Sequence, residues 1–459
     1  MLLAYTPCAK AQPQPNPATV LADFKKQQEL ESRIYSDQRL RQLGGMQQLP
    51  PKDAFERHEF ILQTAQHKPV SKAELQMQEC LQLMREEKAD PGKLLASSSN
   101  SYQSAEFVSK TQLYTNALLQ LKAMLEGRQR LSLRKAYWSL ESAYGNTYLS
   151  YPEYSKIISE SSAFIKTWMW QNNYPAKNNE ALNAAIQKFM SDTLTTVVRP
   201  VDDAGTIKTR HLPFRYDYVD FKGEQDHRNY FVTKCLSTGY GQCNSLPVVY
   251  LLLAESIGAK AYLSIAPQHS FIKYPTDKGI FGYEPTSGYH ISDQWYMDHL
   301  YITPEAVRNG VYLDTLSKKE IVANCVLDLA FGYLNKHGVA DGKFIAECIQ
   351  TTRTHAPSGK LELYVRLVES HLLSAQLVQV LKKHGAISAE QINSIPEAMS
   401  LYQALQKNEA LISQLGYQPM PEQFYERIMQ QHEDKAQTQK TQHISGKEKR
   451  NMFIQTKEK

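Results

Sequence analysis

One change in hydrophobic periodicity, close to residue 200, limits the fold of this chain more than any other feature of its sequence. Before this point, apolar residues recur at intervals of three and four residues among Lys, Glu and Gln, a spacing typical of amphipathic helices. Between His211 and Tyr301, tyrosines and short runs of β-branched residues favour strands instead. Helical spacing returns after Pro304 and continues to about residue 430. We therefore expect an α+β region flanked by mainly α-helical N- and C-terminal regions.

The segment Arg199–Gly205 marks the first boundary, because the helical spacing stops there and turn-forming residues cluster. The expected organisation is a helical N-terminal region over residues 12–200, an α+β core over 201–303 and a helical C-terminal domain over 304–430. Expected helices of the first region lie near residues 54–66, 71–89, 103–126, 130–145, 152–171 and 178–198. Expected strands of the core, which would form an antiparallel sheet, are Ala261–Ala266, Ser270–Tyr274 and Ile280–Glu284.

Both ends of the chain differ from the rest. Residues 1–11 resemble the end of a secretory signal that lacks a basic start. This leaves two locations open: a secreted or periplasmic one, or the cytoplasm if these residues are only a frayed terminus. Residues 431–459 are polar and lack apolar periodicity, which predicts a disordered basic tail.

Composition excludes two classes of partner. Of the 459 residues, 42% are hydrophobic, which is enough for two or three packed cores. Lys and Arg number 52 and Asp and Glu 47, and this net charge of +5 is too small for the global basic field of a nucleic-acid-binding protein. The longest strongly apolar stretch, Leu246–Ala254, is well short of the roughly 20 residues that a membrane-spanning helix needs. We expect neither a nucleic-acid partner nor a membrane span.

The candidate metal ligands do not form a known metal motif. The six cysteines include no CxxC pair, which excludes a zinc ribbon and a thioredoxin-type redox motif. An acidic cluster upstream of the core lacks the fixed ligand spacing of a calcium loop, and we interpret it as a solvated approach to the first strand. Its members are Asp217, Asp220, Glu224, Asp226 and His227. We expect no metal and no organic cofactor.

One segment combines a loop, a cysteine and a helix. Thr238–Pro247 contains two glycines and Cys243, and apolar residues follow it until Gly258, which supplies a left-handed stop. Proline is favoured in the first turn of a helix, so the helix should begin near residues 244–246. Cys243 would then lie at the helix N-terminus, where unpaired N–H groups and the helix dipole favour a thiolate.

The neighbours of Cys243 suit the binding of a substrate. Gly241 lets the backbone approach a substrate closely, because glycine has no side chain. The amide of Gln242 and the backbone N–H groups around Asn244 are candidates for stabilising an oxyanion, although a loop residue such as Gln242 can equally point outward.

A nucleophilic thiolate needs a base, and the base needs a group that orients it. His269 opens the strand that runs to Tyr274, and Glu284 lies on the next strand. If Tyr274 and Gly279 close a four-residue hairpin loop, the same register places His269 directly opposite Glu284 on one face of the sheet. A slip of one residue would place the two on opposite faces.

This pattern resembles the transglutaminase-like superfamily, which has a papain-like Cys/His/acid fold. The resemblance rests on Tyr240-Gly241-Gln242-Cys243 at a helix start, the downstream histidine, and the acidic-Pro-Thr element Glu284–Thr286, and it covers residues 227–298. It implies a papain-like core with an antiparallel sheet. It also implies Cys243 as nucleophile, His269 as general base and acid, and Glu284 as the group that orients the histidine.

Two residues depart from the family pattern. Glu284 stands where the family usually has aspartate, and glutamate can also accept the histidine N–H bond. Asn244 stands where animal transglutaminases have tryptophan, which supports hydrolysis or general acyl transfer better than protein crosslinking. Two hypotheses follow. The first is a cysteine-dependent enzyme that acts on an amide or peptide acyl group of a protein or peptide substrate. The alternative is a non-catalytic scaffold whose helical regions bind a protein or peptide partner.

Overall fold

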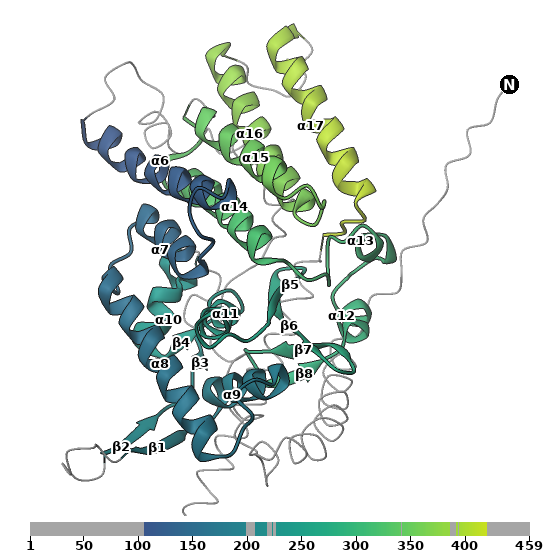
Figure 1. Ribbon diagram of the computed structural model, residues 1–459. Coiled ribbons are helices and arrows are strands. Elements are labelled where there is room, and N and C mark those ends of the chain that lie inside the picture. The colour runs from purple at the N-terminus through teal and green to yellow at the C-terminus, as the bar shows by residue number, and fades with distance from the viewer. Residues whose placement is uncertain are drawn as a thin grey trace, which may run out of the picture.

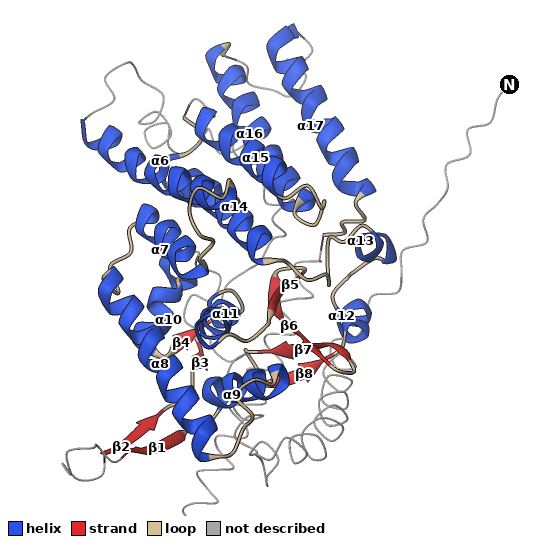
Figure 2. Cartoon of the chain, in the orientation of Figure 1, coloured by secondary structure: helices blue, strands red, loops and turns tan. Residues whose placement is uncertain are grey.

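The computed structural model describes residues 105–198, 207–217, 223, 226–340, 342–385, 392 and 394–419 (Figure 1). The expectations for the signal-like residues 1–11, the helices 54–66 and 71–89, the segment 199–205 and the basic tail 431–459 lie outside these residues. Within the described chain, helices surround one small sheet and two short strand pairs (Figure 2).

Four helices precede the sheet region, near the positions that the apolar spacing predicts. They are α6 (Ala105–Leu125), α7 (Leu133–Tyr144), α8 (Tyr151–Gln171) and α9 (Asn179–Ser191). The starts of the last three follow from capping, because the side chains of Ser132 and Asn178 accept backbone N–H groups of α7 and α9, and Ser150 forms a capping box with Glu153.

The expectation of one helix over residues 178–198 is wrong at its C-terminal end. The helix ends at Ser191, and Leu194–Val198 forms strand β1, which pairs antiparallel with β2 (Ile207–His211). The run Leu-Thr-Thr-Val-Val is rich in β-branched residues, whose stiff side chains favour a strand over a helix.

The middle of the chain is organised around α11 (Ser245–Ile257). A short 3₁₀ helix, His227–Tyr230, and α10 (Val232–Thr238) precede it, together with a two-residue parallel pair of β3 (Arg215–Tyr216) and β4 (Tyr240–Gly241). The predicted start near residues 244–246 is confirmed, and Gly258 ends α11 with a φ of 86°, the left-handed conformation that glycine adopts without strain. Residues Leu246–Ala254 are all buried, so α11 is enclosed on every side.

A four-stranded antiparallel sheet lies next to α11. Its strands follow one another in sequence as β5 (Tyr262–Ala266), β6 (His269–Thr276), β7 (Gly279–Glu284) and β8 (Tyr289–Ile291). Figure 1 shows α11 between this sheet and the helices α7 and α8. The antiparallel sheet that the sequence predicts is therefore present, with a fourth strand that was not expected.

The predicted hairpin register between β6 and β7 is wrong by two residues. Thr276 pairs with Gly279, so the loop has two residues and not four. Pro275 was expected to lie in the loop, but it pairs with Ile280 at a position where an antiparallel ladder needs no N–H donor. Because the error is an even number of residues, His269 and Glu284 keep the same face of the sheet, and Glu284 lies diagonal to His269 instead of opposite it.

Helices dominate again after the sheet. They are α12 (Asp293–His299), α13 (Pro304–Arg308), α14 (Lys318–His337), α15 (Lys343–His355), α16 (Glu362–Lys383) and α17 (Pro396–Gln414). No helix of the described chain combines the length and apolar character that crossing a membrane requires.

Two hydrophobic clusters connect these elements. The larger one extends from Tyr114 on α6 to Leu372 on α16 and contains the apolar residues of α11. The second joins the sheet and α12 to the C-terminal helices, because Phe271 and Tyr296 belong to it together with Leu363, Leu367 and Ile412. The C-terminal helices therefore pack against the part of the sheet that carries His269.

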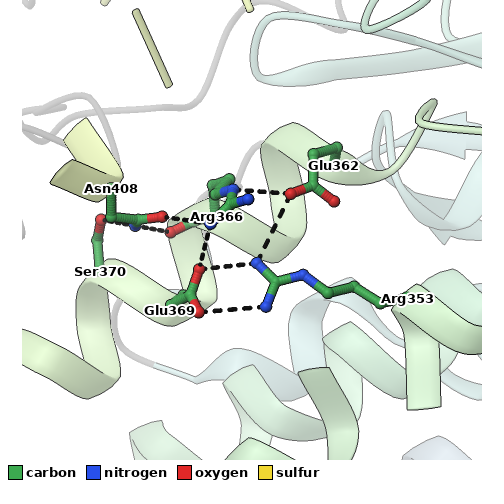
Figure 3. Close-up of polar contacts among 6 residues, drawn as sticks. All are labelled: Arg353, Glu362, Arg366, Glu369, Ser370 and Asn408. Atoms are coloured by element: carbon green, nitrogen blue, oxygen red, sulfur yellow. Dashed lines mark hydrogen bonds and ion pairs between the residues drawn. The ribbon is translucent and has the colours of Figure 1, made fainter. Parts of the chain in front are cut away.

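An ion-pair network holds the last three helices together (Figure 3). Arg353 on α15 binds both carboxylate oxygens of Glu369 on α16, with nitrogen to oxygen distances of 2.7 and 3.2 Å. Arg366 bridges Glu362 and Glu369, at 2.7 and 2.9 Å. Asn408 of α17 donates to the backbone carbonyl of Arg366 and to Ser370, both at 2.8 Å. The bidentate geometry of the Arg353–Glu369 pair makes it stronger than an isolated surface pair.

The end of α17 contacts α13 at a position that admits only glycine. Gly416 has a φ of 85°, and a Cβ atom there would lie 2.5 Å from the backbone nitrogen of Ala306. Thr303 donates its hydroxyl proton to the Gly416 carbonyl at 2.7 Å. This close contact fixes the C-terminal helix against the segment that follows α12.

We predict that Gly416→Ala lowers the free energy of unfolding more than Gly359→Ala does. Gly359 has a φ of 81°, and a Cβ atom at this position would meet no other atom within 4 Å, so its substitution carries only the conformational cost, about 1 kcal/mol. Gly416→Ala adds the overlap with Ala306, about 1 to 3 kcal/mol more. Urea unfolding of both variants measures the difference, and equal losses would show that the contact with α13 contributes nothing to stability.

Candidate active site

Cys243 lies in the tight connection between β4 and α11. Gly241 precedes it in a confined space, where a Cβ atom would approach the Cys235 sulfur to 2.6 Å and the Ser245 hydroxyl oxygen to 2.7 Å. The absence of a side chain at Gly241 therefore makes room for the side chains of Cys235 and Ser245, and not for a substrate as expected from the sequence. The Ser245 hydroxyl also accepts the backbone N–H of Gln242 at 2.9 Å. These contacts hold the backbone before Cys243 in one conformation.

The Cys243 side chain is partly exposed and faces the turn between β5 and β6. Its sulfur lies 3.9 Å from the carbonyl oxygen of Gln268, a turn residue with a φ of 55°. The Ser270 hydroxyl donates to the Cys243 carbonyl at 2.6 Å, which connects the cysteine loop to β6. Cys243 therefore lies beside the strand that begins with His269.

The imidazole of His269 contacts the carboxylate of Glu284. The contact joins His269 Nε2 to Glu284 Oε2, and the two side chains are 21% and 4% exposed. The Cys243 side chain also lies close enough to the His269 ring to raise the pKa of the imidazole. Because Nε2 contacts Glu284, Nδ1 is the ring nitrogen that remains to exchange a proton with the Cys243 thiol.

Glu284 is buried and receives several hydrogen bonds. Its Oε1 accepts the backbone N–H of Thr286 at 3.0 Å and the Thr286 hydroxyl at 2.7 Å. Its Oε2 accepts the Tyr296 hydroxyl at 2.8 Å in addition to the histidine. A buried carboxylate is stable as an ion only when donors of this kind surround it.

The pKa values of the pair move apart in the directions expected of an ion pair. Burial lowers the pKa of His269, but the Glu284 carboxylate and the hydrogen bonds with Cys243 and Glu284 outweigh burial and raise this pKa to about 10. Burial raises the pKa of Glu284, and the neighbouring His269 and Thr286 outweigh it, so the net pKa is lowered. The imidazolium and the carboxylate therefore coexist at neutral pH.

The structure brings Cys243, His269 and Glu284 together, and it places the other candidates around them. Gln242 is fully buried, while Asn244 is exposed directly after the cysteine. Among the hydrogen bonds of the described residues, none uses the backbone N–H of Cys243 or of Asn244. These two N–H groups, which lie at the start of α11, are therefore available to a ligand.

The described carboxylates of the acidic cluster upstream of the site form ion pairs, and the His227 ring packs against Tyr144. Asp217 contacts Lys234, and Asp226 binds Arg228 at 2.7 Å. Asp220 and Glu224 lie outside the described residues. The described residues contain no group of three or more His, Cys, Asp or Glu side chains that suits a metal ion.

Sequence reasoning missed three residues that support the site, namely Ser270, Thr286 and Tyr296. Thr286 belongs to the acidic-Pro-Thr element, so its position two residues after Glu284 was a usable signal. Ser270 follows His269 directly. Nothing in the sequence indicates Tyr296, which reaches Glu284 only because α12 folds back beside the sheet.

The site thus combines a cysteine before a buried helix with a histidine and a carboxylate on an adjoining antiparallel sheet. A family model described as the transglutaminase-like superfamily matches residues 180–326, so the chain contains a transglutaminase-like domain. This match begins in α9 and ends in α14, and it is wider than the residues that carry the resemblance in sequence. No curated protein and no solved structure matched the chain.

We predict that Glu284→Gln lowers the pKa of His269 by about 1 to 3 pH units, because the charge that raises it is removed while burial remains. Titration of the His269 ring by NMR measures this shift, with His269→Ala identifying the signal. An unchanged pKa would mean that the contact with Glu284 does not determine the charge of the imidazole.

Stability should depend on pH through the same pair. A histidine whose pKa is raised on folding contributes its full stabilisation below its unfolded value of about 6.5 and loses it as the pH rises through about 10. We predict that the free energy of unfolding falls between these values, and that the fall is smaller in Glu284→Gln. Parallel unfolding curves at pH 6, 8 and 10 compare the two proteins, and identical pH dependence would contradict the assignment.

Proposed function

We propose that this protein is a cysteine-dependent acyl-transfer enzyme whose nucleophile is Cys243, with His269 as general base and acid and Glu284 as the residue that orients the histidine. The observation that carries the proposal is the double engagement of His269, which contacts the buried Glu284 through Nε2 and interacts with Cys243. A histidine fixed between a carboxylate and a thiol is the arrangement that nucleophilic catalysis by cysteine needs.

The proposed reaction has two steps. The Cys243 sulfur attacks the carbonyl carbon of an amide or ester, the bond from that carbon to nitrogen or oxygen breaks, and His269 gives its proton to the departing group. The product of this step is a thioester on Cys243. Water or an amine then attacks the thioester, its proton passes to His269, and the thiolate is released. Apart from the substrate and the water or amine acceptor, the proposed steps use side chains and backbone groups of the chain.

The start of α11 would stabilise the charge that develops during attack. The backbone N–H groups of Cys243 and Asn244 lie at a helix N-terminus, where partial positive charge accumulates. An oxyanion on the attacked carbon would accept hydrogen bonds from these groups. Gln242 is better suited to a packing role, because its side chain is fully buried.

The proposed substrate is a protein or peptide that presents an amide or ester, and hydrolysis is favoured over crosslinking. Asn244 occupies the position directly after the nucleophile and is exposed. A small polar side chain there gives water access to the thioester, whereas a large apolar ring would exclude it.

We predict that dilute iodoacetamide labels Cys243 at pH 6 at least about tenfold faster than it labels the same cysteine in urea-unfolded chains, because the adjoining histidine and the N-terminus of α11 would activate the sulfur as a nucleophile. His269→Ala should abolish this difference. The experiment uses chains in which Cys8 and Cys80 are replaced by serine, and mass spectrometry of peptides locates the label.

Faster labelling of Cys243 than of the other cysteines is not by itself sufficient. Cys235, Cys325 and Cys348 are buried, and burial raises the pKa of each thiol, so they would label slowly whatever Cys243 does. The matched control is His371→Ala on α16, which should leave the rate at Cys243 unchanged. Labelling of Cys243 at the rate of the unfolded chain, unaffected by His269→Ala, would favour the non-catalytic scaffold.

A further inference from the structure

Tyr296 connects the carboxylate of the site to the core beneath it. It lies on α12, a short helix that begins after Ser292, whose hydroxyl oxygen accepts the backbone N–H of Trp295. The Tyr296 side chain is 1% exposed, and its hydroxyl donates to Glu284 Oε2 at 2.8 Å. This is the same oxygen that contacts His269 Nε2.

The ring of Tyr296 is held by packing. Its centroid lies 4.4 Å from that of Phe271 on β6 and 6.0 Å from that of His269. Both Tyr296 and Phe271 belong to the second hydrophobic cluster, which includes Leu363, Leu367 and Ile412 of the C-terminal helices. A tyrosine has few rotatable bonds, so packing of the ring also fixes the position of its hydroxyl.

We propose that Tyr296 is a positioning residue for the active site, which acts through Glu284 by fixing the orientation and the charge of its carboxylate. This inference rests on the proposed function of Cys243 and His269. It also assigns a role to the C-terminal helices, which belong to the same hydrophobic cluster as the ring of Tyr296 and support it.

The role follows from how the carboxylate is held. Thr286 donates two hydrogen bonds to Oε1, so that oxygen is fixed by the turn that follows β7. Only Oε2 faces the histidine. Without a second hydrogen bond to anchor it, the carboxylate could rotate about the Cγ–Cδ bond of Glu284, and Oε2 would lose its alignment with His269 Nε2. The Tyr296 hydroxyl supplies this anchor. It also favours the ionised form of Glu284, because a hydrogen bond donated to a carboxylate stabilises the negative charge.

Tyr296→Phe tests the proposal, because it removes the hydroxyl and keeps the ring that packs on Phe271. We expect the pKa of Glu284 to rise by about one pH unit, the effect of losing one hydrogen bond to a charged group. The ¹³C signal of the Glu284 carboxyl reports this pKa directly, and its absence in Glu284→Gln identifies it. The rate at which iodoacetamide labels Cys243 at pH 6 should fall about threefold to tenfold.

Tyr312→Phe is the matched control. Tyr312 is 3% exposed and belongs to the same hydrophobic cluster, and no hydrogen bond of its hydroxyl is present among the described residues. This variant should leave both the pKa of Glu284 and the labelling rate unchanged. Equal thermal midpoints of the two variants would exclude a difference in folding.

The outcomes separate this inference from the proposed function. If wild-type Cys243 labels rapidly but Tyr296→Phe changes neither the pKa of Glu284 nor the labelling rate, the positioning role is wrong and the catalytic proposal stands. If wild-type Cys243 labels no faster than in the unfolded chain, the catalytic proposal fails. In that case, a raised pKa of Glu284 in Tyr296→Phe would still support the inference that the Tyr296 hydroxyl holds the Glu284 carboxylate.

Discussion

The structure depends on the complete burial of α11. A helix that is apolar on every face must be surrounded, and here helices lie on one side of it and the four-stranded sheet on the other. Its first backbone N–H groups cannot be buried without partners, because each unpaired donor in the interior is costly. The N-terminus of α11 therefore lies outside the core, directly after β4, and Cys243 lies at this point. The location of the thiol is a consequence of where this helix must begin.

A second constraint is the burial of the Glu284 carboxylate. Removing a charge from water costs several kcal/mol unless hydrogen bonds and an opposite charge replace the solvent. The chain provides these replacements from one continuous segment, because Thr286 follows Glu284 in the turn and Tyr296 follows it on α12. Only His269 comes from an earlier strand. The geometry of the pair is thus determined mainly by local structure after β7 and by the core that packs against α12.

Much of this arrangement was predictable from the sequence, and the errors have identifiable causes. The loop, the cysteine and the start and stop of α11 follow from Pro247, Gly258 and a run of apolar residues, all of which act locally. The hairpin register was missed because proline is typical of loops, although a strand tolerates Pro275 where its N–H is not needed. Tyr296 was missed because its contact depends on tertiary packing against the C-terminal helices, which no spacing in sequence encodes.

The corrected register gives a physical reason for glutamate at position 284. Residues directly opposite each other on antiparallel strands have Cβ atoms about 5 Å apart. Diagonal neighbours are farther apart, with about 7 to 8 Å between their Cα atoms and somewhat less between their Cβ atoms. The pairing of Ile272 with Tyr283 makes His269 a diagonal neighbour of Glu284. A longer side chain is needed to cover that separation, and glutamate has one methylene more than the aspartate usual in the family. The diagonal register and the longer side chain are therefore both consistent with contact between the imidazole and the carboxylate.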